Sequence, residues 1–284
     1  MLLNKIKKML FGDVLKQDGL MTTLARVTKR PAIYFDIEVT DCCNLKCKAC
    51  GSFAPLAKKT FVDKNEIKRD LERLSELSSG VCHHINIMGG EPLLHPEIVD
   101  IISITRECFP IGSIFLVTNG ILLMKQDELF WSVCRDKDIV IAPTHYPINI
   151  DYNKIRNKVV EEKCRYQCFG TPAKYWLFTG ISEKTNANEA KRFLECPNAN
   201  NCSVLKEGKI YMCPKPAKIN LVNDAFGTNF KVTEKDFVDI YKVKSIDEIL
   251  DFLSKPIPFC RYCNEWEKTE WGVSKKEKNE WVRD

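Results

Sequence analysis

Short apolar runs alternate with amphipathic segments through the first half of the chain, and this alternation restricts the possible folds more than any other feature. The apolar runs predict strands at 32–39, 85–88, 113–117 and 138–142. The segments between them have helical spacing of apolar residues or helix-start signals, which predicts helices at 64–77, 96–108, 126–134 and 153–161. Four strand–helix units in succession predict an α/β fold with a parallel sheet and right-handed crossovers.

The alternation stops near residue 185, where cysteine spacing becomes the main pattern. One or two further strands are expected within 166–178, and a strand pair is expected at 203–205 and 209–212. We divide the chain into a basic amphipathic helical segment (1–31), the main α/β domain (32–185), a small cysteine-rich domain (186–265) and a charged tail (266–284). The tail is predicted to be helical, with its tryptophans packed against the body.

Composition and charge exclude several classes of protein. The 14 cysteines occur without a recognisable signal peptide, which predicts a reducing, cytoplasmic setting and cysteines that bind metal or act in catalysis. No stretch has the roughly 20 apolar residues of a membrane span. The net charge of +5 resides in residues 1–31, so the body has no basic footprint for nucleic acid. The basic segment is expected to pack on the main domain, and contact with a membrane surface is the alternative.

Three cysteines lie close together in the loop that follows the first predicted strand. Cys43, Cys47 and Cys50 are separated by three and then two residues, so their thiolates can reach three corners of one metal cluster. Cys42 adjoins Cys43 and points to the opposite side. An iron–sulfur cube held by three cysteines leaves one iron open to a small molecule, which implies chemistry rather than electron transfer alone.

Other polar and glycine-rich motifs also follow predicted strands. The run Gly89-Gly90-Glu91-Pro92 follows the second strand, and Thr118 and Asn119 follow the third. The glycines allow close approach of the backbone, and the Glu91 carboxylate can pair with an ammonium group. Because the carboxyl ends of parallel strands meet at one mouth, we expect these groups to surround an amino acid of the methionine type bound at the open iron.

These two motifs together resemble the radical S-adenosylmethionine (SAM) superfamily over roughly residues 32 to 180. The resemblance implies a partial (β/α)6 TIM-type barrel in which Cys43, Cys47 and Cys50 hold a [4Fe-4S] cluster and the Gly-Gly-Glu-Pro run binds SAM. It also implies reductive cleavage of SAM to a 5′-deoxyadenosyl radical that abstracts hydrogen. The residue before the third cysteine is usually aromatic in the family, but here it is Ala49. Phe53 or Tyr146 could supply the missing contact with adenine.

The second group of cysteines resembles the twitch domain, the short form of the SPASM extension, which holds an auxiliary [4Fe-4S] cluster. Five cysteines compete for four ligand positions, and we favour Cys196, Cys213, Cys260 and Cys263, with Cys202 as a substitute. A zinc site on similar cysteines is the alternative.

The resemblance favours a two-electron oxidation, in which an auxiliary cluster accepts an electron from the substrate radical. His145 is then a possible base, although a structural histidine is the simpler interpretation. Cys168 could donate a hydrogen atom, which would make the enzyme an epimerase; a buried structural thiol is again the simpler interpretation.

The expected substrate is a small hydroxylated, sugar-like molecule, because only about thirty residues precede the barrel whereas peptide-modifying relatives commonly carry a leader-binding domain. A peptide-modifying enzyme and a non-catalytic iron–sulfur electron carrier are the alternatives. The resemblance also implies a reductase partner such as flavodoxin or ferredoxin.

Overall fold

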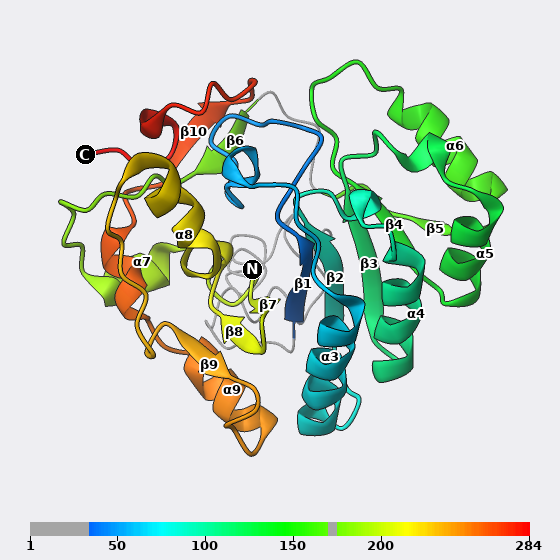
Figure 1. Cartoon of the computed structure of the whole chain (residues 1–284), viewed down its shortest axis with the longest axis horizontal. Coiled ribbons are helices and arrows are strands. Elements are labelled where there is room, and N and C mark those ends of the chain that lie inside the picture. The colour runs from blue at the N-terminus through cyan, green and yellow to red at the C-terminus, as the bar shows by residue number, and fades with distance from the viewer. Residues whose placement is uncertain (1–33, 170–174) are drawn as a thin grey trace, which may run out of the picture.

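The computed structural model describes residues 34–169 and 175–284, so the expected N-terminal helical segment lies outside the described residues. Figure 1 shows helices on the outer side of a curved sheet, with the C-terminal elements on the other side of the molecule. The strands of the first half are β1 (Tyr34–Thr40), β2 (His84–Gly89), β3 (Ser113–Thr118), β4 (Val140–Pro143) and β5 (Arg165–Tyr166). The helices between them are α3 (Lys64–Ser78), α4 (Ile98–Cys108), α5 (Glu128–Asp136) and α6 (Tyr152–Glu161).

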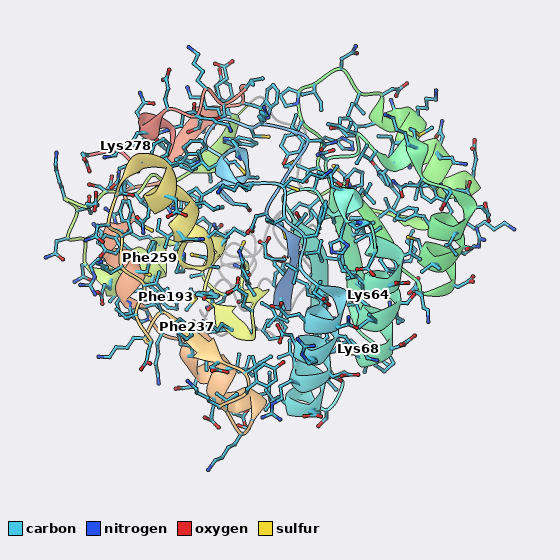
Figure 2. All side chains as sticks on the ribbon, viewed as in Figure 1. Lys64, Lys68, Phe193, Phe237, Phe259 and Lys278 are labelled. Carbon is cyan, nitrogen blue, oxygen red and sulfur yellow. The ribbon has the colours of Figure 1, made fainter. Side chains whose placement is uncertain are left out.

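These elements confirm the predicted α/β fold with a partial barrel. Strands β1 to β5 pair in parallel and in sequence order, and each consecutive pair is joined through a helix. Aspartates cap the N-termini of α3 and α5. The Asp63 side chain accepts a hydrogen bond from the backbone N–H of Asn65, and the Asp127 side chain accepts one from the backbone N–H of Phe130. Charged residues such as Lys64 and Lys68 lie on α3, whereas Phe193 and Phe259 belong to the C-terminal part (Figure 2).

The second half of the chain extends the same sheet. Its elements are β6 (Tyr175–Phe178), α7 (Glu189–Glu195), β7 (Val204–Lys206), β8 (Lys209–Tyr211), α8 (Pro214–Phe226), β9 (Phe237–Asp239), α9 (Ile246–Leu253) and β10 (Glu267–Glu270). The predicted hairpin forms as β7 and β8, and β7 also pairs in parallel with β1. The sheet order is therefore β5-β4-β3-β2-β1-β7-β8-β9.

Two local expectations differ from the structure. Strand β6 does not join the barrel sheet but pairs antiparallel with β10. The C-terminal tail is not a helix, because it forms β10 and one short 3-10 turn at Lys278–Glu280. The expected packing of its tryptophans is confirmed for Trp281, which is fully buried. Pairing with β6 satisfies the backbone groups of the tail as a strand, and the charged pattern of the sequence does not reveal that partner.

Alternate residues along the barrel strands pack in different apolar clusters. Ile114 and Leu116 of β3 belong to the core cluster that includes the helices, whereas Phe115 and Val117 pack with residues of β4 in a separate cluster. This follows from the period of two along a strand. Among the described residues, no helix has the length and apolar character required to cross a membrane.

A polar network occupies the barrel near the start of β1 and β2. Asn86 donates to the carboxylate of Asp36 at 2.8 Å, and the ring of His84 lies 2.8 Å from the Asn86 side-chain oxygen. Burial raises the pKa of Asp36 to about 7, and the nearby charge of Glu38 acts in the same direction while the Asn86 hydrogen bond opposes it.

Asp36 should therefore make the free energy of unfolding depend on pH. Because the pKa of Asp36 is raised in the folded state, that state binds the proton more tightly than the unfolded state. The resulting contribution of Asp36 to the free energy of unfolding is complete below about pH 4 and is lost as pH rises through about 7. Asp36→Asn, whose amide oxygen can still accept from Asn86, should flatten this dependence, which is about 1.4 kcal/mol per pH unit for one full proton. Urea unfolding from pH 5 to 8 measures the effect. The exposed Asp251→Asn serves as the control, and parallel pH profiles for Asp36→Asn and the wild type would contradict the prediction.

Candidate active site

The loop after β1 brings three cysteines to one cavity of about 320 Å³ at the carboxyl ends of the strands. Cys43, Cys47 and Cys50 are the only cysteines among the described residues that line it. The other predicted residues that line the same cavity are Ala49, Gly89, Gly90, Thr118, Asn119 and Tyr146. The structure thus brings together most of the groups that the sequence predicts at this mouth.

Each of the three thiols receives hydrogen bonds. The backbone N–H of Leu45 lies 3.3 Å from the Cys43 sulfur, and the Trp271 indole N–H lies 3.4 Å from that of Cys47. The Cys50 thiol is hydrogen-bonded by backbone groups of Ser52 and Ala54. Donors of this kind stabilise sulfur ligands that carry negative charge.

The C-terminal tail is hydrogen-bonded to the cysteine loop. The backbone of Lys48 donates to Gly272 at 2.7 Å, and that of Ser274 donates to Lys46 at 2.9 Å. The indole of Trp281 donates to the carbonyl of Cys50 at 3.0 Å. No pattern in the sequence predicts that these tail residues contact the cysteine loop. Only the number of tryptophans in the tail indicated that it packs back on the body.

The chemistry of the three thiols fits a metal cluster. Burial raises the pKa of Cys43 and of Cys47 to about 12, and burial also raises the pKa of Cys50. Metal binding therefore has to displace protons from these thiols. Within the part of the chain that the structure describes, no three side chains of the His, Cys, Asp or Glu type are grouped closely enough to hold a single metal ion. A cube separates its ligands further, because each thiolate binds a different iron.

The two glycines of the Gly-Gly-Glu-Pro run are required by close backbone packing. A Cβ at Gly89 would lie 2.2 Å from the carbonyl oxygen of Thr40, and one at Gly90 would lie 2.0 Å from that of Cys42. Gly89 also has a φ of 140°. The run therefore lies directly against the start of the cysteine loop, and the backbone N–H of Glu91 donates to Cys42.

Glu91 occupies a different position from the one predicted. Its side chain is fully buried and is not among the residues that line the cavity. Its carboxylate accepts hydrogen bonds from the Thr118 hydroxyl (2.6 Å) and from the backbone N–H groups of Asn119 (2.8 Å) and Leu93 (3.1 Å). Burial raises the pKa of Glu91 to about 7, against the effect of these hydrogen bonds. In this structure Glu91 positions Thr118 and Asn119, which line the cavity. Pro92 is buried at the start of a short 3-10 turn.

The structure distinguishes between the two aromatic residues proposed for the adenine contact. Phe53 is buried and does not line the cavity, whereas Tyr146 does. Tyr146 packs edge-on against Trp176, with 6.0 Å between ring centroids. Ala49 has a φ of 54° and lines the cavity. Tyr146 is therefore the better placed of the two rings to contact a base.

The two residues predicted to be catalytic lie elsewhere. His145 and Cys168 line a separate hollow of about 500 Å³. The His145 ring stacks on Tyr152 at 4.0 Å and lies 2.8 Å from the hydroxyl of Tyr166, and burial lowers its pKa. These contacts fit the structural interpretation of His145. Both residues come from loops at the strand ends, but they line a hollow other than the cysteine cavity.

Four of the five C-terminal cysteines line one small cavity of about 30 Å³. Cys196 follows α7, Cys213 precedes α8, and Cys260 and Cys263 lie in and after a 3-10 turn at Pro258–Tyr262. Cys202 is not among the lining residues. The four favoured cysteines thus share one cavity, and the substitute Cys202 lies outside it.

Residues 37–135 match the model of the Radical SAM superfamily. All three loop cysteines and the Gly-Gly-Glu-Pro run fall within the matched residues. The matched part of the chain is therefore a radical SAM domain. Such a domain implies a [4Fe-4S] cluster and SAM at the cavity lined by the loop cysteines, and the residues present there fit both groups.

Two curated relatives each match 40% of the chain. GTP 3′,8-cyclase of Limosilactobacillus fermentum is 35% identical over 119 residues, which are 40% of this chain and 34% of that protein. GTP 3′,8-cyclase of Actinobacillus pleuropneumoniae serotype 7 is 29% identical over 117 residues, which are 40% and 33% of the two chains. The chain thus spans about a third of the length of the curated relatives it matches.

One solved structure matches a larger part of this chain. The crystal structure of BtrN in complex with AdoMet and 2-DOIA superposes with a TM-score of 0.50 at 17% identity. The match covers 82% of this chain and 93% of that chain. The likeness concerns the fold and extends beyond the radical SAM domain into the C-terminal half.

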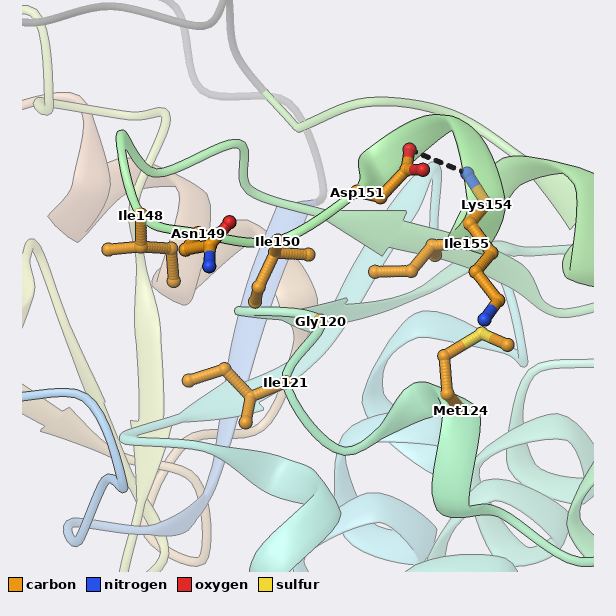
Figure 3. A pocket seen from close by; sticks show the side chains of 9 residues that line it. All are labelled: Gly120, Ile121, Met124, Ile148, Asn149, Ile150, Asp151, Lys154 and Ile155. Carbon is orange, nitrogen blue, oxygen red and sulfur yellow. Dashed lines mark hydrogen bonds between the residues drawn. The ribbon is translucent and has the colours of Figure 1, made fainter.

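Figure 3 shows a hollow of about 420 Å³ that includes Gly120, the residue after Asn119 of the cysteine cavity. Four of its nine lining residues are isoleucines, and the backbone N–H of Lys154 donates to the Asp151 carboxylate as part of the N-cap of α6. Because this hollow contains no cysteine and is mostly apolar, its chemistry does not indicate a reaction site.

Gly90→Ala should weaken SAM binding by shifting the backbone of the cysteine loop. The added methyl group would have to displace the carbonyl of Cys42, which moves the cavity wall and the cysteine loop together. The expected loss of affinity is about tenfold or more. Equilibrium dialysis of cluster-loaded protein with SAM measures it. Gly272→Ala is the matched control, since nothing lies within 4 Å of a Cβ there. Unchanged SAM affinity in Gly90→Ala would show that SAM binding does not require the close contact between the backbones at Gly90 and Cys42.

Proposed function

We propose that this radical SAM enzyme cleaves SAM reductively and oxidises a small hydroxylated, sugar-like substrate by two electrons, with the help of an auxiliary [4Fe-4S] cluster. A cluster on Cys43, Cys47 and Cys50 would supply one electron to SAM, and the resulting 5′-deoxyadenosyl radical would take a hydrogen atom from the substrate. The electron would come from a reductase such as flavodoxin or ferredoxin, in the cytoplasm.

The residues of the cavity have separate tasks in this proposal. Gly89 and Gly90 let the backbone approach the amino-acid part of SAM, and Thr118 and Asn119 offer neutral hydrogen bonds to its polar groups. Tyr146 offers a ring to the adenine. The aromatic wall of Tyr146 and Trp176 limits access of water, which suits a radical that would otherwise react with solvent or protein.

The proposed oxidation rests on the observation that the two cysteine-lined cavities share part of their wall. Thr179 and Trp266 line both the cavity of the loop cysteines and the small cavity of Cys196, Cys213, Cys260 and Cys263. A substrate in the first cavity would therefore lie next to the second group of thiols. This arrangement supports transfer of the substrate's second electron to an auxiliary cluster.

The polar lining supports a substrate that carries oxygen atoms. Thr144, Asn198 and Lys215 line the cavity together with the SAM-binding groups. These side chains donate hydrogen bonds to hydroxyl or carbonyl oxygens. The BtrN structure that shares the fold holds AdoMet and 2-DOIA, which are its own ligands.

The epimerase alternative has less support. It requires a thiol that can return a hydrogen atom to the substrate, and Cys168 was the sequence-based choice. Cys168 lines the other hollow, and the described residues of the SAM cavity include no cysteine beyond the three of the loop.

SAM cleavage tests the central claim. Anaerobically reconstituted protein with dithionite and SAM should form 5′-deoxyadenosine, and Cys47→Ala should abolish its formation. Cys108→Ser, which changes a cysteine at the end of α4, should remain active. Addition of deuterated aminocyclitols or sugars, but not of peptides, should transfer deuterium to 5′-deoxyadenosine. Protein that contains both clusters but forms no 5′-deoxyadenosine would instead be an electron carrier.

Iron counting tests the auxiliary cluster separately. Two cubes require about eight iron atoms per chain, and Cys213→Ala should retain about four of them. About four iron atoms in the wild type, with 5′-deoxyadenosine still formed, would remove the auxiliary cluster and the argument for oxidation with it.

A further inference from the structure

Lys215 lies in the wall between the two cysteine groups. It follows Cys213 by two residues, in the first turn of α8, and its exposed fraction is 6%. Its ammonium group donates to the carbonyl oxygen of Thr179 at 2.6 Å and lies 3.9 Å from the sulfur of Cys263. Lys215 also lines the SAM cavity. One buried cation therefore contacts an auxiliary thiol and faces the substrate space.

The charge of Lys215 has no carboxylate partner within ion-pair distance among residues 34–169 and 175–284. Its closest ring contacts are Phe178 and Trp266, with the ammonium 5.7 and 5.9 Å from the ring centroids. Lys218, one turn later in α8, is also buried but pairs with Glu38 and Asp41. A buried charge without a counterion is costly, so Lys215 needs a negative group that the four thiols can provide.

The four thiols are placed to provide that charge. A cube with four thiolate ligands is an anion, and it gains a further negative charge when it is reduced. A neighbouring cation stabilises the reduced form more than the oxidised form, and a hydrogen bond to a ligand sulfur acts in the same direction.

We propose that Lys215 is the charge partner of the auxiliary cysteine cluster and raises its reduction potential. This inference rests on the auxiliary cluster of the proposed function. Lys215 acts as a positioning residue, because it changes the properties of the cluster rather than reacting itself. Because Lys215 also lines the cavity of the loop cysteines, it would place this positive charge between the auxiliary cluster and the substrate.

The test compares Lys215→Met with Lys215→Arg in the full-length protein. To isolate the auxiliary cluster, Cys43, Cys47 and Cys50 are changed to alanine, and the remaining cluster is titrated electrochemically and followed by electron paramagnetic resonance. Lys215→Met should shift the midpoint potential to a more negative value, and Lys215→Arg should remain near the wild type. Lys242→Met, which removes the same charge from an exposed side chain, should have no effect.

The outcomes separate this inference from the proposed function. An unchanged potential in Lys215→Met, with iron content intact, would overturn the role of Lys215 alone. If Lys215→Met loses the auxiliary iron, retention in Lys215→Arg supports charge compensation, and loss in both variants overturns it. Wild-type protein without auxiliary iron would overturn the proposed function and this inference together.

Discussion

The two halves of this chain are held together by a buried group of charges at the end of β1. Lys218 of α8 is fully buried and forms ion pairs with Glu38 of β1 and with Asp41, which begins the cysteine loop. Lys206 of β7 pairs with Asp41 at 2.7 Å. Loss of one member of a buried pair commonly costs about 3–5 kcal/mol, because it leaves the other charge unpaired. The position of the cysteine loop thus depends on residues about 180 positions later in the chain.

This connection explains why the radical SAM domain and the second cysteine group share a cavity wall. Helix α8 begins directly after Cys213, continues with Lys215 in the wall and reaches Lys218 one turn later. The helix therefore fixes the distance between the second thiol group and the loop after β1. Strand β7 holds the same region from the other side, through its parallel pairing with β1. Relative motion of the two centres would break both the ion pairs and the sheet.

Local patterns predicted the parallel sheet and much of the site. The apolar period identified β1 to β4, and the motifs at the strand ends placed Cys43, Gly90 and Asn119 near one mouth. The prediction for Glu91 was less accurate, because sequence shows that a carboxylate is present but not which donors surround it. His145 lines a different hollow for a related reason: a loop residue can lie on either side of the strand end, and here its ring packs against Tyr152 and Tyr166.

The sequence by itself determined the identity of the thiols, the glycines that allow close approach and the order of the strand–helix units. These depend on residue type and on spacing over a few residues. Only the tertiary structure decided that Trp271 donates to Cys47, that Cys202 stays outside the second cavity and that Lys215 lies between the two groups. Those contacts join residues far apart in the chain, and their energies come from burial and charge pairing that appear only when the whole chain is packed.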